Sequence, residues 1–292
     1  MKRAAAFLLA VMLLLTGCAK PAVHYDVRRD LGIYFTNADD VIAQLRSAMR
    51  QRHWQITITY QSHRDNMEEL GTIVRELMEY ALSETDSPEE GDYLRHQSGG
   101  YKMQYTSRWE GETCHYEICI RPQYYTTSEQ EAQVTEAVYA LLQGFGFSST
   151  TSDYEKVSTI YDWVLTHVRY DEIHAGNPQH HLKTTAFAAL VQGQAVCQGY
   201  AVLLYRLLRE CGISARVITG TAGEAQEYHA WNIVCIEGLY YNLDATWDSA
   251  SGERTHFLLP DAAFTDHTRD AVYADAVFTE AYPMADRAYG TD

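Results

Sequence analysis

A cysteine, a histidine and an aspartate follow one another in the second half of this 292-residue chain, and their order constrains the fold more than any other feature. Cys197 opens an apolar helical stripe that ends at Gly212. Residues 229–236 and 239–244 then read as two strands, and Glu237-Gly238 between them is a favourable two-residue hairpin turn. The pattern therefore predicts a cysteine-bearing helix followed by an antiparallel hairpin.

The register of this hairpin determines which aspartate can meet the histidine. With the turn at that position, Trp231 pairs with Asp244, and His229 shares a face with Trp231. Asp244 then lies diagonally opposite His229, at a Cα separation of roughly 7–8 Å, which lets a carboxylate reach an imidazole nitrogen. Asp248 lies beyond the strand end, so we expect it to be the poorer partner.

The surroundings of Cys197 favour a reactive thiol over a buried one. In the first turn of a helix, unpaired backbone N–H groups and the positive end of the dipole stabilise a thiolate and can help to hold an oxyanion. The polar side chains of Gln194 and Gln198 are close to the cysteine in the sequence. Gly193 and Gly199 are expected to leave room for the close approach of a substrate backbone.

These three side chains are the groups needed for acyl transfer through a thioester. His229 takes the thiol proton and later gives it to the leaving amine, while Asp244 orients the imidazole and supports its positive form. The thiolate of Cys197 attacks a peptide or carboxamide carbonyl. Water as the acceptor gives hydrolysis and an amine gives cross-linking, and the sequence leaves this choice open.

Residues 153–248 resemble the transglutaminase-like core, a relative of the papain-like cysteine peptidases. The resemblance implies a Cys-His-Asp triad, carried here by Cys197, His229 and Asp244, and a cysteine-bearing helix packed on an antiparallel sheet. Residues 22–125 lie outside it. The matching pieces are Lys156-Val157 to Tyr170-Asp171, Thr185-Ala186-Phe187, Gly193-Gln194-Ala195-Val196-Cys197-Gln198-Gly199-Tyr200, His229-Ala230-Trp231-Asn232 and Asp244-Ala245-Thr246-Trp247-Asp248.

We therefore expect an α+β fold, with a small α+β domain before the core, and a protein or peptide substrate with no cofactor. A cysteine peptidase or amidase is favoured, because the acidic loops that bind activating calcium in the animal cross-linking enzymes are not recognisable. Two alternatives stay open, because the family includes both: a protein-cross-linking transglutaminase, and a non-catalytic peptide-binding module on the same fold.

The start of the chain reads as a secretory signal. Lys2 and Arg3 precede an apolar run over residues 4–15, which is too short to span a bilayer as a mature helix. Leu15-Thr16-Gly17-Cys18 follows and resembles the lipobox of bacterial lipoproteins. The resemblance implies cleavage before Cys18, lipidation of its thiol, and an extracytoplasmic protein anchored to the bacterial membrane.

The chain is thus expected to have four segments, with a domain boundary near residue 126. They are a signal peptide (1–17), a lipidated tether (18–24), an N-terminal α+β domain of unknown role (25–125) and the transglutaminase-like domain (126–292). Periodicity, turn residues and capping patterns predict helices over 38–50 and 67–82, a strand over 53–60, an acidic surface loop over 83–92, a hairpin of 101–107 with 114–121, and capping boxes beginning at Ser128 and Ser152.

Charge and cysteine spacing exclude other classes of function. The net charge is −16 and no basic stripe offsets it, so nucleic acid is not expected as a partner. The four remaining cysteines lack zinc-site spacing and are expected to be free: Cys114, Cys119, Cys211 and Cys235. His174, His180 and His181 lie in a loop rich in turn residues, where we expect solvated side chains and not a metal site.

Overall fold

The computed structural model describes residues 38–63, 65 and 67–291. The expected signal peptide, the lipidated Cys18 and the tether lie outside these residues, as does the first part of the expected N-terminal domain. No helix of the described ranges is both long enough and apolar enough to cross a bilayer.

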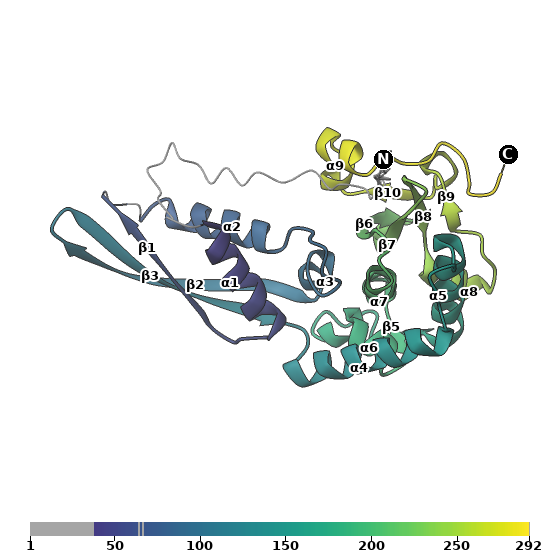
Figure 1. Cartoon of the computed structure of the whole chain (residues 1–292), viewed down its shortest axis with the longest axis horizontal. Helices are drawn as coiled ribbons and strands as arrows, with labels where there is room; N and C mark the ends of the chain where they lie inside the picture. Colours follow the sequence, from purple (N-terminus) through teal and green to yellow (C-terminus); the bar gives the residue numbers. More distant parts are fainter. Residues whose placement is uncertain (1–37, 64, 66, 292) are drawn as a thin grey trace, which may run out of the picture.

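The N-terminal part is a three-stranded antiparallel sheet with two helices on one face (Figure 1). Its strands run in the spatial order β1 (Ile56–Ser62), β3 (Thr113–Tyr124) and β2 (Ser98–Glu110). Helices α1 (Ala38–Arg50) and α2 (Leu70–Ala81) supply most of the remaining core. Burial alternates along β1, as expected of a sheet with one packed face and one solvated face.

Most of the predicted elements in this part are present, with shifted ends. The 38–50 helix and the β2–β3 hairpin are confirmed, and the hairpin is longer than predicted. The strand predicted over 53–60 begins later, at Ile56, so Trp54 precedes β1 and is 72% exposed. Met67 likewise lies before α2 and is exposed. Cys114 and Cys119 point to opposite faces of β3, and all five described cysteines are free.

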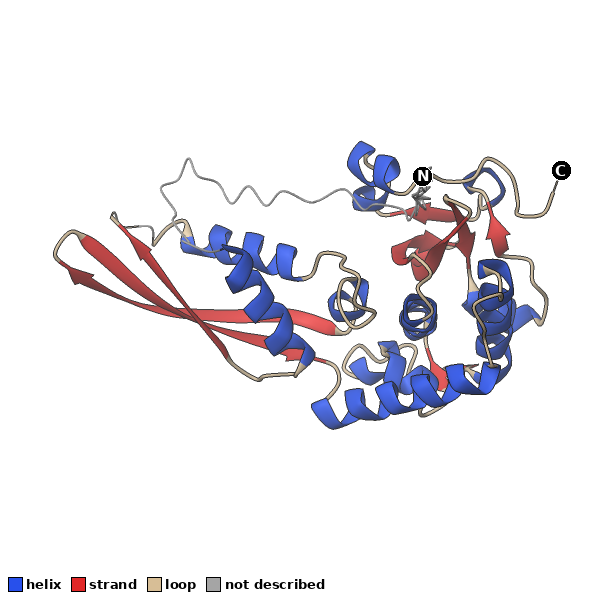
Figure 2. Ribbon diagram, in the orientation of Figure 1, coloured by secondary structure: helices blue, strands red, loops and turns tan. Residues whose placement is uncertain are grey.

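The C-terminal part packs helices on both faces of a five-stranded antiparallel sheet, as Figure 2 shows by element type. The spatial strand order is β10-β6-β7-β8-β9. A separate parallel pair, β4 and β5, precedes the cysteine helix. The bounds are α4 Ser128–Phe145, α5 Asp153–His167, β4 Arg169–Tyr170, α6 Ala186–Leu190, β5 Gln194–Ala195, α7 Cys197–Glu210, β6 Ala215–Ala222, β7 Glu227–Ile236, β8 Leu239–Leu243, α8 Ala245–Ser251, β9 Phe257–Leu259, β10 His267–Arg269 and α9 Ala276–Ala281.

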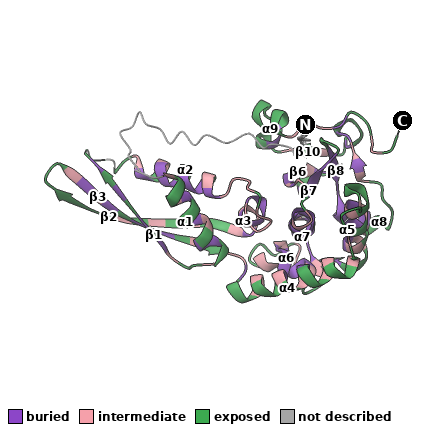
Figure 3. Cartoon of the chain, in the orientation of Figure 1, coloured by how far each residue is buried: buried purple, intermediate pink, exposed green. Residues whose placement is uncertain are grey.

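Helix α7 is the centre of the larger core. Residues Cys197 to Arg209 are almost all buried, and the helix lies between the sheet and α4–α6 (Figures 1 and 3). A second apolar cluster, which includes Ile218, Trp231 and Phe278, covers the opposite face of the sheet. Strand β7 is therefore buried from His229 to Ile236, which leaves its side chains little freedom.

The helix starts follow from capping chemistry. Ser152 and Glu155 form the predicted capping box of α5. The box of α4 begins one residue earlier than predicted: the Thr127 side chain accepts from the Gln130 N–H, and the Gln130 side chain accepts from the Thr127 N–H. Gly146 ends α4 in a left-handed conformation, at φ 65°.

The segment predicted as a surface loop, 83–92, is not a simple solvated loop. Asp92 is fully buried, and its Oδ2 accepts from Arg216 Nε at 2.7 Å and from the Val217 N–H at 2.8 Å. Burial, followed by the nearby Asp92 charge, raises the pKa of Glu84 to about 7. The acidic composition of this loop therefore serves a buried ion pair with β6, which the sequence did not indicate.

Candidate active site

Cys197 is the first residue of α7, as predicted. Val196 is the N-cap in an extended conformation, so the chain turns sharply into the helix at the cysteine. The cysteine is 7% exposed and lines a cavity of about 410 Å³. His229 lines the same cavity, together with Tyr170 and Trp247.

The β7–β8 hairpin has the predicted register. Ile236 pairs with Leu239, and the ladder continues to Asn232 opposite Leu243. Glu237 and Gly238 form the turn with φ of 55° and 87°, the positive values that a type I′ turn requires.

This register brings His229 and Asp244 into contact. His229 Nε2 lies 2.7 Å from Asp244 Oδ2, and both side chains are buried. The other ring nitrogen, Nδ1, is then the one left for the thiol of Cys197, which lines the same cavity. The structure thus brings together the three residues predicted from the sequence.

Asp244 also forms the N-cap of α8. Its Oδ1 accepts from the backbone N–H groups of Thr246 and Trp247 at 2.9 and 3.3 Å. This leaves Oδ2 for the histidine and fixes the plane of the carboxylate. The orientation of the His229 imidazole therefore depends on the start of helix α8, which directly follows β8.

Electrostatics in this cluster favour a charged imidazole. Burial lowers the pKa of His229, but hydrogen bonds to Asp244 and Cys197 outweigh it and raise the pKa to about 10. Burial raises the pKa of Asp244, but the hydrogen bonds from His229 and His267 hold it well below its usual range. An imidazolium beside a thiol at a helix N-terminus is the arrangement that stabilises a thiolate.

A second histidine contacts the same carboxylate. His267 Nε2 lies 3.1 Å from Asp244 Oδ2, and its Nδ1 lies 2.7 Å from Asp266 Oδ1. Asp266 in turn contacts His256, at 3.1 Å. Both imidazoles thus contact Oδ2 of Asp244. The series of alternating carboxylates and imidazoles continues through Asp266 to His256, towards the surface.

Asp248, which was expected to be the poorer partner of His229, forms its hydrogen bonds elsewhere in the fold. Its Oδ2 accepts from the Tyr161 hydroxyl at 2.6 Å, and its Oδ1 accepts from the backbone N–H groups of Thr255 and His256 at 2.9 Å. The side chain is fully buried. The hydrogen bonds of Asp248 connect α5 and the segment before β9 to α8.

Comparison with known proteins assigns the central part of this fold. Residues 142–245 match the family model of the transglutaminase-like superfamily, and this range contains Cys197, His229 and Asp244. The chain carries a transglutaminase-like core.

Two curated relatives match part of the chain. The chain is 29% identical over 114 residues to the kyphoscoliosis peptidase of Mus musculus and 30% identical over 108 residues to that of Homo sapiens. These alignments cover 36% and 34% of this chain. The chain spans 17% and 16% of the lengths of the two relatives.

Solved structures with some likeness include a crystal structure of a TGase, with 19% identity and a TM-score of 0.36 over 49% of this chain and 44% of that chain. A candidate cysteine protease from Cytophaga hutchinsonii shares 18% identity, with a TM-score of 0.35 over 62% of this chain and 73% of that chain.

Two glycines of the transglutaminase-like core have a different role from the one predicted. A Cβ on Gly199 would lie 2.6 Å from the Ala195 Cβ and 2.9 Å from the Lys183 carbonyl oxygen, so this glycine lets α7 pack against the preceding segment. Gly193 adopts φ 71°, a left-handed backbone conformation that the turn requires and that glycine adopts without strain. Neither position supports the predicted role of making room for substrate.

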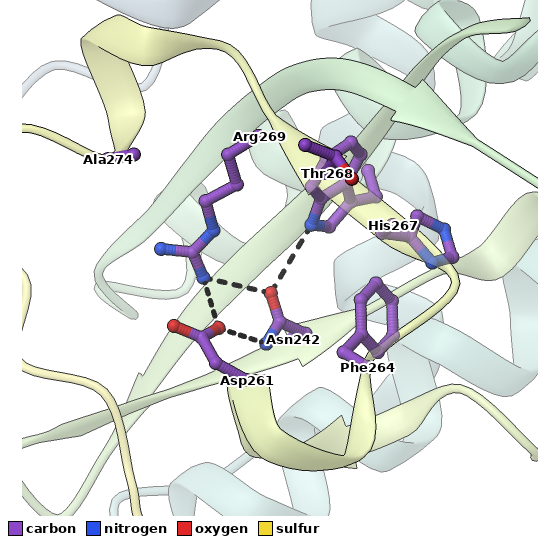
Figure 4. A pocket seen from close by; sticks show the side chains of 8 residues that line it. Asn242, Asp261, Phe264, His267, Thr268, Arg269 and Ala274 are labelled. Carbon is purple, nitrogen blue, oxygen red and sulfur yellow. Dashed lines mark hydrogen bonds and ion pairs between the residues drawn. The ribbon is translucent and has the colours of Figure 1, made fainter. Parts of the chain in front are cut away.

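No sequence pattern pointed to His267, because its strand β10 has only three residues and His267 lies 23 residues from Asp244. Gly220 allows this strand to approach, since a Cβ there would lie 2.0 Å from the Thr268 carbonyl oxygen. His267 also borders a second hollow, beside Phe264 and an ion pair of Arg269 with Asp261 (Figure 4).

Within the described residues, two groups of side chains bring potential metal-ligand atoms within 4.8 Å of one another. One is His229, Asp244 and His267, whose atoms already contact one another in the hydrogen bonds above. The other is Asp171, His174 and His180, at the start of the loop that precedes α6.

Proposed function

We propose that this protein is a thiol enzyme that cleaves peptide or carboxamide bonds through a Cys197–His229–Asp244 triad, as a cysteine peptidase or amidase. The observation that carries the proposal is the 2.7 Å contact between His229 and Asp244 beside a cavity that Cys197 also lines. The family match supports the same chemistry, because thiol peptidases and acyltransferases share this core.

The first half-reaction forms a thioester. The thiolate of Cys197 adds to the substrate carbonyl carbon, and the carbonyl π electrons move to the oxygen. The first N–H groups of α7 have no partner within the helix and can donate to this oxyanion. His229 then gives the proton on Nδ1 to the leaving nitrogen, the C–N bond breaks, and the amine leaves.

The second half-reaction returns the enzyme. His229, now neutral, takes a proton from water as the water oxygen attacks the thioester carbonyl. The C–S bond breaks, the carboxylic acid leaves, and the thiolate–imidazolium pair is restored. Asp244 stays ionised throughout, and it holds Nε2–H of the imidazole so that Nδ1 faces the thiol.

The substrate we propose is a cationic peptide. Glu172, Glu224 and Glu227 line the cavity, all exposed, and among its lining residues in the described part of the chain there is no lysine or arginine. None of the three carboxylates forms an ion pair with another described residue. A cavity lined by one sign of charge attracts ligands of the opposite sign. Tyr170 and Tyr228 add partly exposed aromatic surface for the peptide.

A second candidate, a cross-linking transglutaminase, differs only in the acceptor. Glu172, Glu224 and Glu227, which favour a cationic peptide, form an acidic rim of the cavity that also favours an amine acceptor. This observation supports the second candidate. Incubation with a glutamine-containing peptide and a labelled primary amine separates the two. Released ammonia without incorporated label supports amidase action, and incorporated label supports cross-linking.

We also propose that the enzyme acts outside the cytoplasm, tethered to a bacterial membrane through lipid on Cys18. The support is the charged start, the apolar run over residues 4–15 and the lipobox-like Leu15-Thr16-Gly17-Cys18. A tether of this kind keeps the active site close to the membrane surface while the folded core stays in water.

The decisive experiment is covalent labelling of the thiol. A peptide with a vinyl sulfone in place of the scissile carbonyl is incubated with the full chain, and the labelled residue is identified by mass spectrometry. We expect a single adduct on Cys197, none in Cys197→Ala, and an unchanged adduct in the matched control Cys211→Ala. Unchanged hydrolysis by a folded Cys197→Ala protein would refute the thiol mechanism, and labelling without any turnover of peptides would favour the binding-module alternative.

A further inference from the structure

Three side chains outside the triad converge beside the cysteine helix. His174 Nδ1 lies 2.8 Å from Asp171 Oδ2, and the rings of His174 and His180 stack with their centroids 4.0 Å apart. One potential ligand atom from each of Asp171, His174 and His180 lies within 4.8 Å of the other two. Asp171 is buried, whereas both histidines are partly exposed.

A buried lysine, Lys183, holds the loop that carries the histidines. The Lys183 ammonium donates to the backbone carbonyls of His174, Ala175 and Asn177, at 2.7, 2.7 and 2.8 Å. Lys183 itself is 8% exposed. The sequence predicted solvated histidines because a loop offers no regular spacing for ligands. This buried ammonium provides the fixed geometry that the sequence could not indicate.

The donor set suits a borderline divalent transition metal. Two imidazoles and one carboxylate are ligands that Zn²⁺ accepts, at about 2.0–2.2 Å each. Tetrahedral ligands at such distances lie roughly 3.3 Å apart. The ligand atoms lie within 4.8 Å of one another, and the two rings stack with an interplanar angle of 18°, so His180 must rotate out of the stack for both imidazoles to reach one ion. The exposed side of the two rings leaves a fourth position for water or a substrate group.

The structure assigns a Zn²⁺ site to Asp171, His174 and His180. Gln194 Nε2 donates to Asp171 Oδ1 at 3.2 Å, in the way that polar neighbours orient metal-binding carboxylates. The Asp171 N–H donates to the Ala195 carbonyl, at 3.0 Å, two residues before Cys197. Bound metal therefore braces the chain that leads into the catalytic helix, without entering the catalytic cavity.

The test measures metal affinity directly, in the full chain with Cys197→Ala, so that the reactive thiol does not compete for the ion. Zn²⁺ is titrated against a chromophoric chelator. We expect one tight equivalent, and a loss of affinity of at least about tenfold in His174→Gln and in His180→Gln. His181→Gln is the matched control, because His181 lies in the same loop but stacks on Tyr125, and it should bind as tightly as its parent.

Co²⁺ gives a readout that needs no substitution at the ligands. With Co²⁺ in place of Zn²⁺, the parent protein should show the intense visible d–d absorption of a tetrahedral site, and Zn²⁺ should abolish it. Equal Zn²⁺ affinity in all four proteins, or no such absorption, would show that Asp171, His174 and His180 form only a hydrogen-bonded loop.

Discussion

Asp244 and His229 lie 15 residues apart in the chain, yet Oδ2 of the aspartate and Nε2 of the histidine are 2.7 Å apart. The contact crosses from β7 to the end of β8, and the same carboxylate begins α8 through its other oxygen. One buried side chain thus joins the orientation of the imidazole to the start of a helix.

Asp244→Asn should lower kcat/KM by roughly 10⁴-fold, the loss seen when a serine-protease triad aspartate becomes asparagine. The asparagine amide donates to Nε2 of His229, which forces the imidazole proton onto Nδ1, the nitrogen that must accept the proton of the Cys197 thiol. Steady-state kinetics with a fluorogenic peptide measure the loss.

Asp248→Asn is the matched control for that substitution. Asp248 accepts from Tyr161, Thr255 and His256 but does not contact His229. We therefore expect a lower melting temperature with little change in kcat/KM for the folded fraction. Equal activity of Asp244→Asn and the parent protein would mean that the aspartate does not orient the imidazole.

His267→Gln should lower kcat by about tenfold with little change in KM, because the charged Asp244 carboxylate loses one of its hydrogen bonds. His267 is a positioning residue, so the pH profile should change as well. Without its hydrogen bond the pKa of Asp244 rises, and the acid limb of kcat moves to higher pH.

His256→Gln is the control for His267, because the His256 ring contacts Asp266 and Asp248 but not the Asp244 carboxylate. The acid limb of the kcat–pH profile of His256→Gln should stay at the same pH as in the parent protein. A His267→Gln protein with reduced kcat but the parental pH profile would indicate a purely structural role for His267.

Stability should fall as the pH rises from about 6.5 to about 10. The pKa of His229 is raised from 6.5 to about 10 in the folded protein, so the stabilisation by its charged form is complete below pH 6.5 and disappears as the folded-state group loses its proton near pH 10. Urea denaturation midpoints across this range measure the effect.

His229→Gln should have a flatter pH dependence over the same window. Hydrogen bonding to Asp248 raises the pKa of His256 to about 9, so part of the slope remains in that variant. Removal of both histidines should remove most of it. Superimposable pH profiles for the parent and His229→Gln would contradict a charged His229 in the resting enzyme.

The acidic rim of the cavity predicts a preference for positively charged peptides. In the double variant Glu172→Gln, Glu227→Gln, kcat/KM for a lysine-containing peptide should fall several-fold at low ionic strength, while a neutral peptide of the same length is cleaved as before. Salt should reduce the difference, since exposed charges are screened beyond about 10 Å at 0.1 M. An equal loss for both peptides would argue for a packing role of these residues.

Cys18→Ser should release the protein from membranes. Lipidation needs the thiol, so the variant should fail to partition into detergent phase and should fail to incorporate a labelled fatty acid. Fractionation of cells that express each form measures the partition. An unprocessed apolar start can hold a chain at the membrane by itself, so fatty-acid labelling is the readout that decides. Equal labelling of Cys18→Ser and the parent protein would contradict lipidation at Cys18.

Local sequence was sufficient for the features that depend on neighbours along the chain. The turn at Glu237-Gly238 sets the hairpin register because only two residues separate the strands, and the register places Asp244 diagonally across from His229. Ser152 with Glu155 starts α5 for the same kind of reason. The position of Cys197 at a helix start follows from the apolar stripe behind it.

The remaining features depend on segments that meet only in the folded chain. The fold class, the cysteine helix and the histidine–aspartate pair could be predicted from the sequence, because periodicity and turn chemistry act over a few residues. Packing between distant segments brings His267 to Asp244, buries Asp92 against Arg216 and lets Lys183 order the histidine loop. A buried carboxylate or ammonium needs partners from whichever segment packs against it, and spacing along one strand or helix carries no record of that choice.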